Sequence, residues 1–518
     1  MNGQTRKQRI LSLAVVYLIM VALFVGGVGA VKTACAQDIK QDIKPIDMYL
    51  IGGQSNASGY SVVKNVSGEF SNIMYIGETE KLLDGTNSYY NTLDNFSTYK
   101  KYVTVGYGAS SNKIGPEFGM AKQLDQHYGG EKKAIIFKSA AGGTSIRNIK
   151  SNLSGLYGNW YPRSMWETGF TPDPSVSATG VQYKNFVDNF RTVYNTLKEN
   201  GYSPKVRGMA WMQGEEDLGY ANEYKTLIKA FINDIREDIA GITGDDTDLL
   251  MPFVIGEIAT TFGSYDNSSV PPFNKMQREV AAEIDGVYTI PTSDLIIVGK
   301  NGIEGTDQYH FGDKDAVTLG ERFGEKLLSV GDETLVKLNV VGKNGTAKYN
   351  ISESGTELVV DLKPNKNYKV SSVKVNETEM VENVENNKLV LNVSETKKFV
   401  ITVEFGKKTA LNIKVESDTY KGKVQKDAIY EGDKIMITVT PNAGYKVKSV
   451  TFNDVALTLN EETGMYESEP VTTGGTIKVD YEEVNKEQES TGCGKSGAAT
   501  MACALAALVG SLFLIKRY

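Results

Sequence analysis

The sequence is poor in the residue types that build disulfide scaffolds, zinc sites and nucleic-acid surfaces. Its 518 residues include three cysteines and two histidines. No cysteine lies in the long middle of the chain, which excludes a disulfide framework and a cysteine-based zinc site there. The formal net charge of -7 argues against a nucleic-acid partner, which would need clustered cations. Imidazole chemistry is limited to His127 and His310.

The bulk composition is that of a folded protein with several domains. Hydrophobic residues make up 41% of the chain and charged residues 23%, which is typical of globular proteins rather than of disordered chains. A chain of this length is too long for one ordinary core, so we expect roughly two to four domains.

Both ends of the chain carry long apolar runs. The first run follows a basic start and ends near Ala34-Cys35-Ala36, a pattern typical of a signal peptide over residues 1–36, with an uncleaved anchor as the alternative. Residues 496–515 carry no charge and are long enough to cross a bilayer. The tail 516–518 is basic, which places it in the cytoplasm and the rest outside. A cleaved lipid-anchor signal is the competing interpretation. We therefore expect an exported protein on the cell surface, tethered through a polar stalk at 485–495.

The segment 44–330 alternates short apolar runs with amphipathic stretches. The alternation predicts an α/β domain with a parallel sheet covered by helices on both faces. The expected strands are Met48–Ile51, Ala134–Lys138, Val206–Met212, Pro252–Ile258 and Val287–Ile290. The expected helices lie near Glu117–His127, Tyr183–Asn200, Asn222–Ile239, Asn274–Ile284 and Ala316–Leu328.

Polar residues follow three of these strands, where parallel sheets bind their ligands. Ser55 follows the first strand, a glycine pair that includes Gly143 follows the second, and Gln213 follows the third. His310 comes near the end of the domain, three residues after Asp307, and would reach the same edge through its loop. Each feature alone is also compatible with a turn or with packing. Together they indicate a common site.

This set of residues suits acyl transfer. Ser55 would attack a carbonyl carbon, and His310 would act as general base and then as general acid. A carboxylate must orient the imidazole, and Asp307 lies on the same loop. The Ser55 N–H, the Gly143 N–H and the Gln213 side-chain amide are the expected oxyanion donors.

Four motifs in this order resemble those of the SGNH-hydrolase superfamily, and within it the sialate O-acetylesterase and acetylxylan-esterase branch of carbohydrate esterases. They are Gly53-Gln54-Ser55-Asn56, Gly142-Gly143-Thr144, Trp211-x-Gln213-Gly214-Glu215 and Asp307-x-x-His310. The run Ile114-Gly-Pro-Glu-Phe-Gly-Met120 is also similar to that branch. The resemblance implies a three-layer α/β/α flavodoxin-like fold and a serine mechanism, without metal or cofactor, that removes acetyl groups from sugars.

The resemblance also assigns roles to single residues. It implies Ser55 as the nucleophile and His310 as the base. Asp307 matches the aspartate that precedes the family's histidine, whereas Glu215 occupies a position from which some relatives support the imidazole. We favour Asp307 and keep Glu215 as a helper or substitute. Glu117 is expected to brace the active-site loops.

Substrate-binding residues are expected next to Ser55 and in an aromatic-rich insertion. Aromatic faces stack on sugar rings, and an arginine can pair with a sugar carboxylate such as that of sialic acid. The alternative is a loop packed by its own aromatic side chains. The candidates are Asn56, Arg147, Trp160, Arg163 and Trp166.

The last third of the chain contains an internal repeat. Residues 362–376 recur as 439–453 around a shared Pro-Asn-x-x-Tyr-Lys-Val core, which predicts two small all-β modules at 331–406 and 407–484. The repeats resemble those of bacterial cell-surface proteins. A spacer role is the simplest interpretation, and contact with a glycan or the cell wall is the alternative.

The resulting hypothesis is a surface-anchored serine esterase acting on O-acetylated carbohydrates. A serine esterase or lipase with another acyl specificity would share the same fold and residues. A non-catalytic glycan-binding adhesin is the third possibility, against which the set of Ser55, His310 and Asp307 argues.

Overall fold

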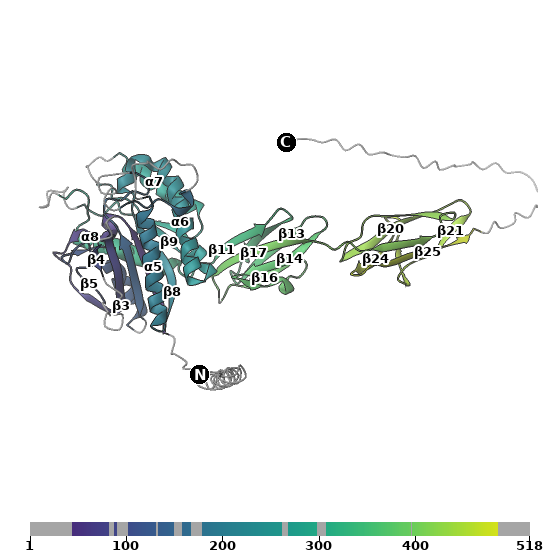
Figure 1. Cartoon of the computed structure of the whole chain (residues 1–518), viewed down its shortest axis with the longest axis horizontal. Helices are drawn as coiled ribbons and strands as arrows, with labels where there is room; N and C mark the ends of the chain where they lie inside the picture. The colour runs from purple at the N-terminus through teal and green to yellow at the C-terminus, as the bar shows by residue number, and fades with distance from the viewer. Residues whose placement is uncertain are drawn as a thin grey trace, which may run out of the picture. The chain divides into compact units, whose positions relative to one another are not determined.

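The chain folds into two compact units. The computed structural model describes residues 44–81, 87–90, 102–130, 133–149, 158–166, 179–261, 268–297, 307–394 and 396–484. The first unit ends at Gly406 and the second begins at Lys407. The first holds an α/β domain followed by a β module, and the second holds another β module (Figure 1).

An eight-stranded sheet forms the middle of the α/β domain. Its central strand pairs in parallel with the strands on both sides, and only the last strand at one edge and one short side strand are antiparallel within the described part. The order across the sheet is β10 (Val287–Ile290), β9 (Phe253–Gly256), β8 (Tyr202–Met212), β1 (Lys44–Gly53), β7 (Ala134–Ala140), β3 (Glu69–Lys81) and β4 (Asn87–Tyr90), with β5 (Tyr102–Thr104) paired to β3.

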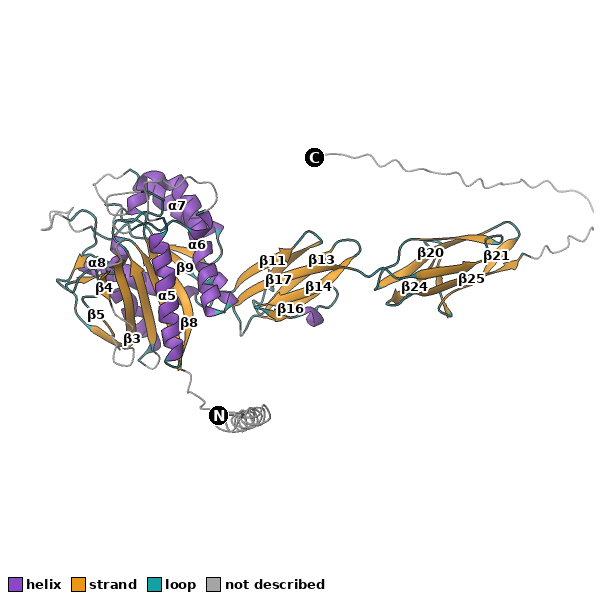
Figure 2. Ribbon diagram, viewed as in Figure 1, coloured by secondary structure: helices purple, strands orange, loops and turns teal. Residues whose placement is uncertain are grey.

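Helices cover both faces of this sheet (Figure 2). Two of them, α3 and α8, pack together on one face, and α5 and α6 cover the other. Their bounds are α2 (Ser55–Ser58), α3 (Pro116–Tyr128), α5 (Val181–Glu199), α6 (Ala221–Thr243), α7 (Val270–Glu283) and α8 (Asp313–Val330). Short 3₁₀ turns are η2 (Arg163–Met165), η3 (Glu215–Tyr220) and η4 (Asp246–Leu250). The α/β/α prediction is confirmed.

Glycines allow α3 and α8 to cross at very short range. A Cβ atom at Gly119 would lie 1.8 Å from the carbonyl oxygen of Val317. One at Gly320 would lie 2.0 Å from the carbonyl oxygen of Pro116. Because only a residue without a side chain fits at either position, the two backbones touch directly there.

Strand β3 is absent from the sequence prediction although it pairs in parallel with β7. Its fully buried stretch, Ile73–Ile76, is only four residues long and runs into polar Gly77-Glu78. Runs of four residues were predicted as strands elsewhere, but here no helical pattern follows the run to complete a strand-helix unit.

Two β modules follow, each built from two facing sheets. In the first, the sheets are β11-β17-β14-β15 and β12-β13-β16; in the second, they are β18-β25-β21-β22 and β19-β20-β24-β23. The strands of the first are β11 (Leu335–Val341), β12 (Gly345–Ile351), β13 (Glu357–Pro364), β14 (Tyr368–Val375), β15 (Thr378–Glu379), β16 (Lys388–Asn392) and β17 (Lys398–Lys407), with the 3₁₀ turn η5 (Val381–Asn383). Those of the second are β18 (Ile413–Ser417), β19 (Gly422–Lys426), β20 (Asp433–Pro441), β21 (Tyr445–Phe452), β22 (Val455–Ala456), β23 (Thr458–Asn460), β24 (Met465–Val471) and β25 (Gly475–Glu483).

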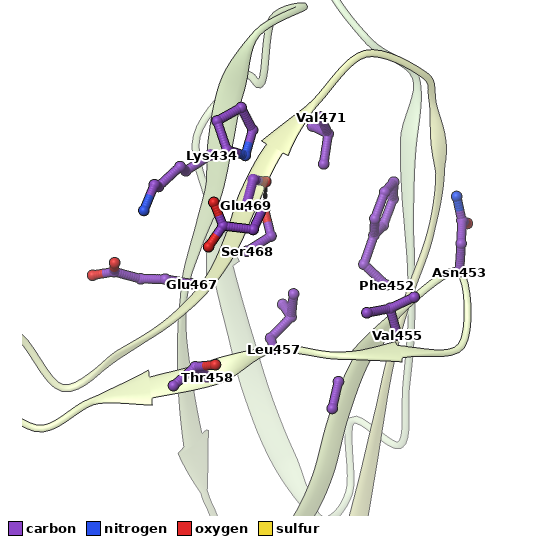
Figure 3. A pocket seen from close by; sticks show the side chains of 12 residues that line it. Lys434, Phe452, Asn453, Val455, Leu457, Thr458, Glu467, Ser468, Glu469 and Val471 are labelled. Carbon is purple, nitrogen blue, oxygen red and sulfur yellow. Dashed lines mark hydrogen bonds between the residues drawn. The ribbon is translucent and has the colours of Figure 1, made fainter.

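The repeated Pro-Asn turn performs the same task in both modules. The side-chain amide of Asn365 donates to the carbonyl of Lys343 at 2.9 Å, and that of Asn442 donates to the carbonyl of Tyr420 at 2.7 Å. The turn thereby ties two loops of the sandwich together. The second module also has a pocket of about 580 Å³, lined among others by Phe452, Leu457 and Glu467 (Figure 3).

The first β module contacts the α/β domain through η4. Leu250 packs against Leu335 and Val400 of the module. Burial raises the pKa of Asp248 to about 6, although a hydrogen bond from Thr243 opposes the rise. Burial likewise lowers the pKa of Lys398 to about 8, against the attraction of Asp248. This contact therefore combines an apolar patch with a partly desolvated pair of opposite charges.

The predicted end segments, residues 1–36 and 485–518, lie outside the described residues. Between residues 44 and 484, no helix that the structure describes has both the length and the apolar character needed to cross a bilayer.

Candidate active site

Ser55 lies at the carboxyl end of the central strand. Gly53 ends β1 with a φ of 136°, and a Cβ there would lie 2.0 Å from the carbonyl oxygen of Met212. The chain then turns into the short helix α2, which spans Ser55–Ser58 and is followed by Gly59 in the left-handed conformation. Ser55 is only 8% exposed. The two glycines thus permit a tight strand-to-helix turn that holds the serine at the sheet edge.

His310 is held by Asp307 on the loop before α8. The imidazole Nδ1 lies 2.7 Å from Asp307 Oδ2. The other carboxylate oxygen accepts the backbone N–H groups of Tyr309 and His310, at 2.9 and 3.1 Å. Partial burial alone would raise the pKa of Asp307, but these hydrogen bonds outweigh it and lower the pKa below its ordinary value. The ionised carboxylate fixes the Nδ1–H tautomer, which leaves Nε2 as the basic nitrogen.

The imidazole also stacks on an aromatic ring. Tyr60 and His310 have ring centroids 4.7 Å apart and planes inclined by 16°. Tyr60 directly follows the serine helix, so the same turn that carries Ser55 also supports the histidine ring. The sequence prediction missed this residue, because nothing in the spacing of Tyr60 distinguishes it from other tyrosines of the domain.

Asn56 connects three segments of the site. Its side-chain Nδ2 donates to Glu215 Oε1 at 2.8 Å and to the carbonyl of Tyr309 at 3.1 Å. Its Oδ1 accepts the backbone N–H of Phe311 at 3.4 Å. The carboxamide therefore binds the framework of the site, on both sides of His310, rather than facing a substrate as the sequence suggested.

Glu215 lies beside this arrangement and not on Nδ1 of the histidine. Burial raises the pKa of Glu215, and the hydrogen bond from Asn56, its own backbone N–H and the proximity of His310 oppose the rise. Its second oxygen, Oε2, is buried without a hydrogen-bond partner among the described residues. Of the two candidate carboxylates, the structure brings Asp307 onto the imidazole and Glu215 onto Asn56.

Gln213 is engaged inside the protein. Its Nε2 lies 2.6 Å from Asp217 Oδ2, 3.1 Å from the carbonyl of Thr144 and 3.3 Å from Gln54 Oε1. Two amide hydrogens are thus shared among three internal acceptors. The structure therefore does not offer this side chain as the oxyanion donor that the sequence suggested. Gly143 lies in the loop after β7 with a φ of 61°.

Asp217 is the residue that organises this side of the site, and the sequence prediction missed it. It is fully buried and accepts hydrogen bonds from the Ser145 hydroxyl, the Ile146 N–H and Gln213. It also binds Arg147 Nε at 2.9 Å. The acidic run Glu215-Glu216-Asp217 after β8 was the available signal. Nothing in the sequence shows which of its three carboxylates is the buried one.

The aromatic insertion packs inward. Trp160 has 0% exposure, packs edge-on against Trp211, and donates its indole N–H to Thr144 Oγ1 at 2.8 Å. It cannot stack on a sugar in this arrangement, so its expected role in binding is wrong. Trp166 is 37% exposed and donates to the carbonyl of Tyr161 at 3.1 Å.

The two arginines expected to bind a sugar carboxylate already have acidic partners. Arg147 is paired with Asp217, and Tyr220 covers its guanidinium at 3.4 Å from the ring centroid. Arg163 is half-exposed and binds Glu237 and Asp238 on α6, at 3.0 and 3.2 Å. Both side chains are therefore used to hold the loops that carry them.

A buried ion pair contacts the end of α2, the short helix that begins at Ser55. Lys138, on β7, donates to Glu117 Oε2 and the carbonyl of Ser58, both at 2.9 Å, and to the carbonyl of Tyr107 at 2.7 Å. Both charged side chains have 0% exposure, and burial lowers the pKa of Lys138. Glu117 also accepts the N–H of Gly115 at 2.8 Å. The ammonium thus holds the carboxyl end of α2.

No group of three or more histidine, cysteine, aspartate or glutamate side chains that could hold a metal ion occurs in the part of the chain that the structure describes.

Comparison with known families identifies the α/β domain. The family described as carbohydrate esterase, sialic acid-specific acetylesterase, matches residues 45–329, more than half of the 518 residues. The chain belongs to this family. The C-terminal part of this esterase is similar to a second family, the divergent InlB B-repeat domain, over residues 411–480.

Solved structures similar to the esterase include several acetylesterases. NanS is 14% identical, covers 55% of this chain and 98% of its own, and has a TM-score of 0.36. A carbohydrate acetylesterase from Xanthomonas citri is 14% identical, with coverages of 68% and 74% and a TM-score of 0.35. A protein from Arabidopsis thaliana is 16% identical, with coverages of 55% and 98% and a TM-score of 0.35. No curated protein matches the sequence of the esterase.

Proposed function

We propose that this carbohydrate esterase removes acetyl groups from O-acetylated sugars through an acyl-enzyme on Ser55. The observation that carries the proposal is the Asp307–His310 pair, with Nδ1 held at 2.7 Å, on the loop that Asn56 ties to the serine turn. The family match over residues 45–329 supports the acetylated sugar as substrate class.

In this mechanism His310 Nε2 takes the proton of the Ser55 hydroxyl while Oγ attacks the acetyl carbon. The backbone N–H groups of Ser55 and Gly143 stabilise the oxyanion of the tetrahedral intermediate. When the carbon–oxygen bond to the sugar breaks, His310 returns the proton to the departing sugar oxygen. Water, activated by the same imidazole, then releases acetate and restores Ser55.

Comparing two substrate classes tests which acetylated sugar the esterase prefers. Acetate release is measured from O-acetylated sialic acid and from acetylated xylan fragments, with wild type and Ser55→Ala. We expect release from at least one sugar by the wild type and a loss of about 10³-fold or more in the variant, with the fold intact. Undiminished release by the variant would exclude the serine mechanism. A series of model esters of increasing acyl length tests the preference for acetyl.

We further propose that the esterase is exported and tethered to the cell surface, with the β modules as spacers. The sequence patterns at 1–36 and 496–518 support this location, and so does the likeness of residues 411–480 to B-repeat domains. Protease treatment of intact cells, followed by assay of the remaining esterase activity, tests it. Activity that survives in intact cells but is lost after lysis would contradict a surface location.

A further inference from the structure

We propose that Lys113, lying over the ring of Tyr60, forms a subsite for the carboxylate of an acidic O-acetylated sugar. The inference rests on the proposed function, since it assigns a substrate class to the same site. It is carried by a stack of three groups, Lys113, Tyr60 and His310, that no sequence pattern indicated.

The stack places a cation against the same tyrosine ring as the imidazole of His310. Lys113 Nζ lies 4.2 Å from the centroid of the Tyr60 ring, and the His310 ring is stacked on that same ring at 4.7 Å. The ammonium and the imidazole therefore both lie against the ring of Tyr60. A cation held in this way on an aromatic face keeps hydrogens available for an anion.

The backbone around Lys113 is well anchored. The short strand β6 (Lys113–Ile114) pairs antiparallel with β2 (Ser61–Val62), which directly follows Tyr60. Lys113 also exchanges backbone hydrogen bonds with neighbouring turns, at 2.9 Å to the carbonyl of Ser110 and 2.9 Å from the N–H of Gly108. The ammonium is therefore presented from a fixed ribbon rather than from a long loop.

Lys113 has no acidic partner, in contrast to the arginines. No carboxylate in the described part of the chain lies within 4.0 Å of its Nζ, and its side chain is partly exposed. Arg147 and Arg163 each bind acidic residues of the protein. Among these three cations, Lys113 is the one left to bind an external anion.

The charge of the site makes such a cation necessary for an acidic substrate. Asp307 is ionised and its side chain is 41% exposed, and the carboxylate of Glu215 accepts from Asn56, which also binds the loop of His310. A sugar carboxylate that approaches His310 meets this negative field, which disfavours its binding. Lys113 offsets that field on the side of Tyr60 and so favours acidic over neutral sugars.

The test compares two forms of one sugar that differ in a single charge. Acetate release is measured from O-acetylated sialic acid and from its carboxyl methyl ester, with wild type, Lys113→Met and Lys113→Arg. We expect the acid-to-ester ratio of kcat/KM to fall about two- to fivefold in Lys113→Met, the size of one partly exposed ion pair, and to be preserved in Lys113→Arg. Lys44→Met, which removes a lysine lying over Tyr202 at the far end of β1, is the matched control and leaves the ratio unchanged.

The outcomes separate the subsite from the function. An unchanged ratio in Lys113→Met, with wild-type thermal stability, would overturn the subsite and leave the esterase function standing. If the wild type releases acetate from no sugar, the proposed function fails, and calorimetry of free sialic acid and its methyl ester then decides the subsite. Preferential binding of the acid that Lys113→Met abolishes supports it, and equal binding of both forms overturns it.

Discussion

The side-chain amide of Asn56 donates to Glu215 at 2.8 Å and so joins the residue after Ser55 to a buried carboxylate. The same nitrogen reaches the carbonyl of Tyr309, the residue before His310. One carboxamide thus sets the spacing between the serine turn and the histidine loop. This role is architectural, since the groups it contacts belong to the protein.

Replacing Asn56 with alanine should therefore lower kcat more than it changes KM. Without the carboxamide, the loop of His310 loses its hold on the serine turn, and Glu215 loses its hydrogen bond. We expect kcat to fall about 10- to 100-fold, as misplaced catalytic groups commonly do. Steady-state kinetics on a chromogenic acetate ester measure it.

Asn72→Ala is the matched control, because Asn72 also donates to a carboxylate, that of Asp125, but away from Ser55 and His310. A loss of activity in Asn56→Ala no larger than in Asn72→Ala would contradict the joining role. Asn56→Asp should lose at least as much activity as Asn56→Ala, since it sets a carboxylate against Glu215.

Asp307→Asn should reduce kcat far more than Glu215→Gln. An amide at 307 no longer fixes the Nδ1–H tautomer of His310, which should cost about 10²- to 10⁴-fold. Glutamine at 215 still accepts the hydrogen bond from Asn56, so we expect a loss of less than about tenfold. Equal losses in the two variants, measured at saturating substrate, would assign the orienting role to both carboxylates.

Breaking the buried pair of Lys138 and Glu117 should destabilise the α/β domain. Lys138→Met leaves Glu117 buried without its counter-charge, which should cost about 3–5 kcal/mol. Urea unfolding followed by tryptophan fluorescence isolates this domain, because all three tryptophans lie in it. Lys122→Met, which removes a partly exposed pair with Glu321, should cost less than about 1 kcal/mol. Similar costs in both variants would show that the buried pair is not structural support.

The contact between η4 and the first β module should make stability depend on pH. Asp248 has an ordinary pKa of 3.8 and a folded pKa of about 6, so between these values the folded state holds a proton that the unfolded state has lost. Stability should therefore fall as the pH rises from about 4 to about 6, by up to about 3 kcal/mol.

Asp248→Asn should remove this fall in stability, because it keeps the shape of the side chain without the charge. Asp245→Asn, at the exposed start of the same turn, should retain most of it, because the charge of Asp245 contributes less to the raised pKa of Asp248 than burial does. Urea midpoints at pH 4 and pH 6.5 measure the difference, and an equal fall in Asp248→Asn and wild type would contradict the assignment.

The sequence predicted the sheet and the order of its motifs well, because parallel strands bring the residues after their carboxyl ends to one edge. Ser55, Gly143 and Gln213 follow β1, β7 and β8 as expected. The sequence could not show which polar groups form hydrogen bonds within the protein and are therefore not offered to a substrate. The Gln213 amide fits an oxyanion donor as well as a framework donor, and only the position of Asp217 distinguishes the two.

The aromatic insertion illustrates the same difficulty. Trp160 looks like a sugar platform in a segment without periodicity, yet its indole fills the space beside Trp211 and finds a polar partner in Thr144. The Lys113–Tyr60–His310 stack was equally hidden, because its members are far apart in the sequence and belong to no repeated pattern. Long-range side-chain contacts of this kind cannot be predicted from the spacing of residues along the chain.

The glycine crossing of α3 and α8 has a consequence for how the enzyme can be inactivated. Helix α8 begins three residues after His310, and α3 carries Glu117 in its first turn. Any side chain at Gly119 or Gly320 would force the two helices apart and carry the histidine with them. A screen for inactive variants should therefore recover substitutions of Gly119 and Gly320 as well as substitutions of Ser55. Neither glycine lies at the proposed site of acetyl cleavage.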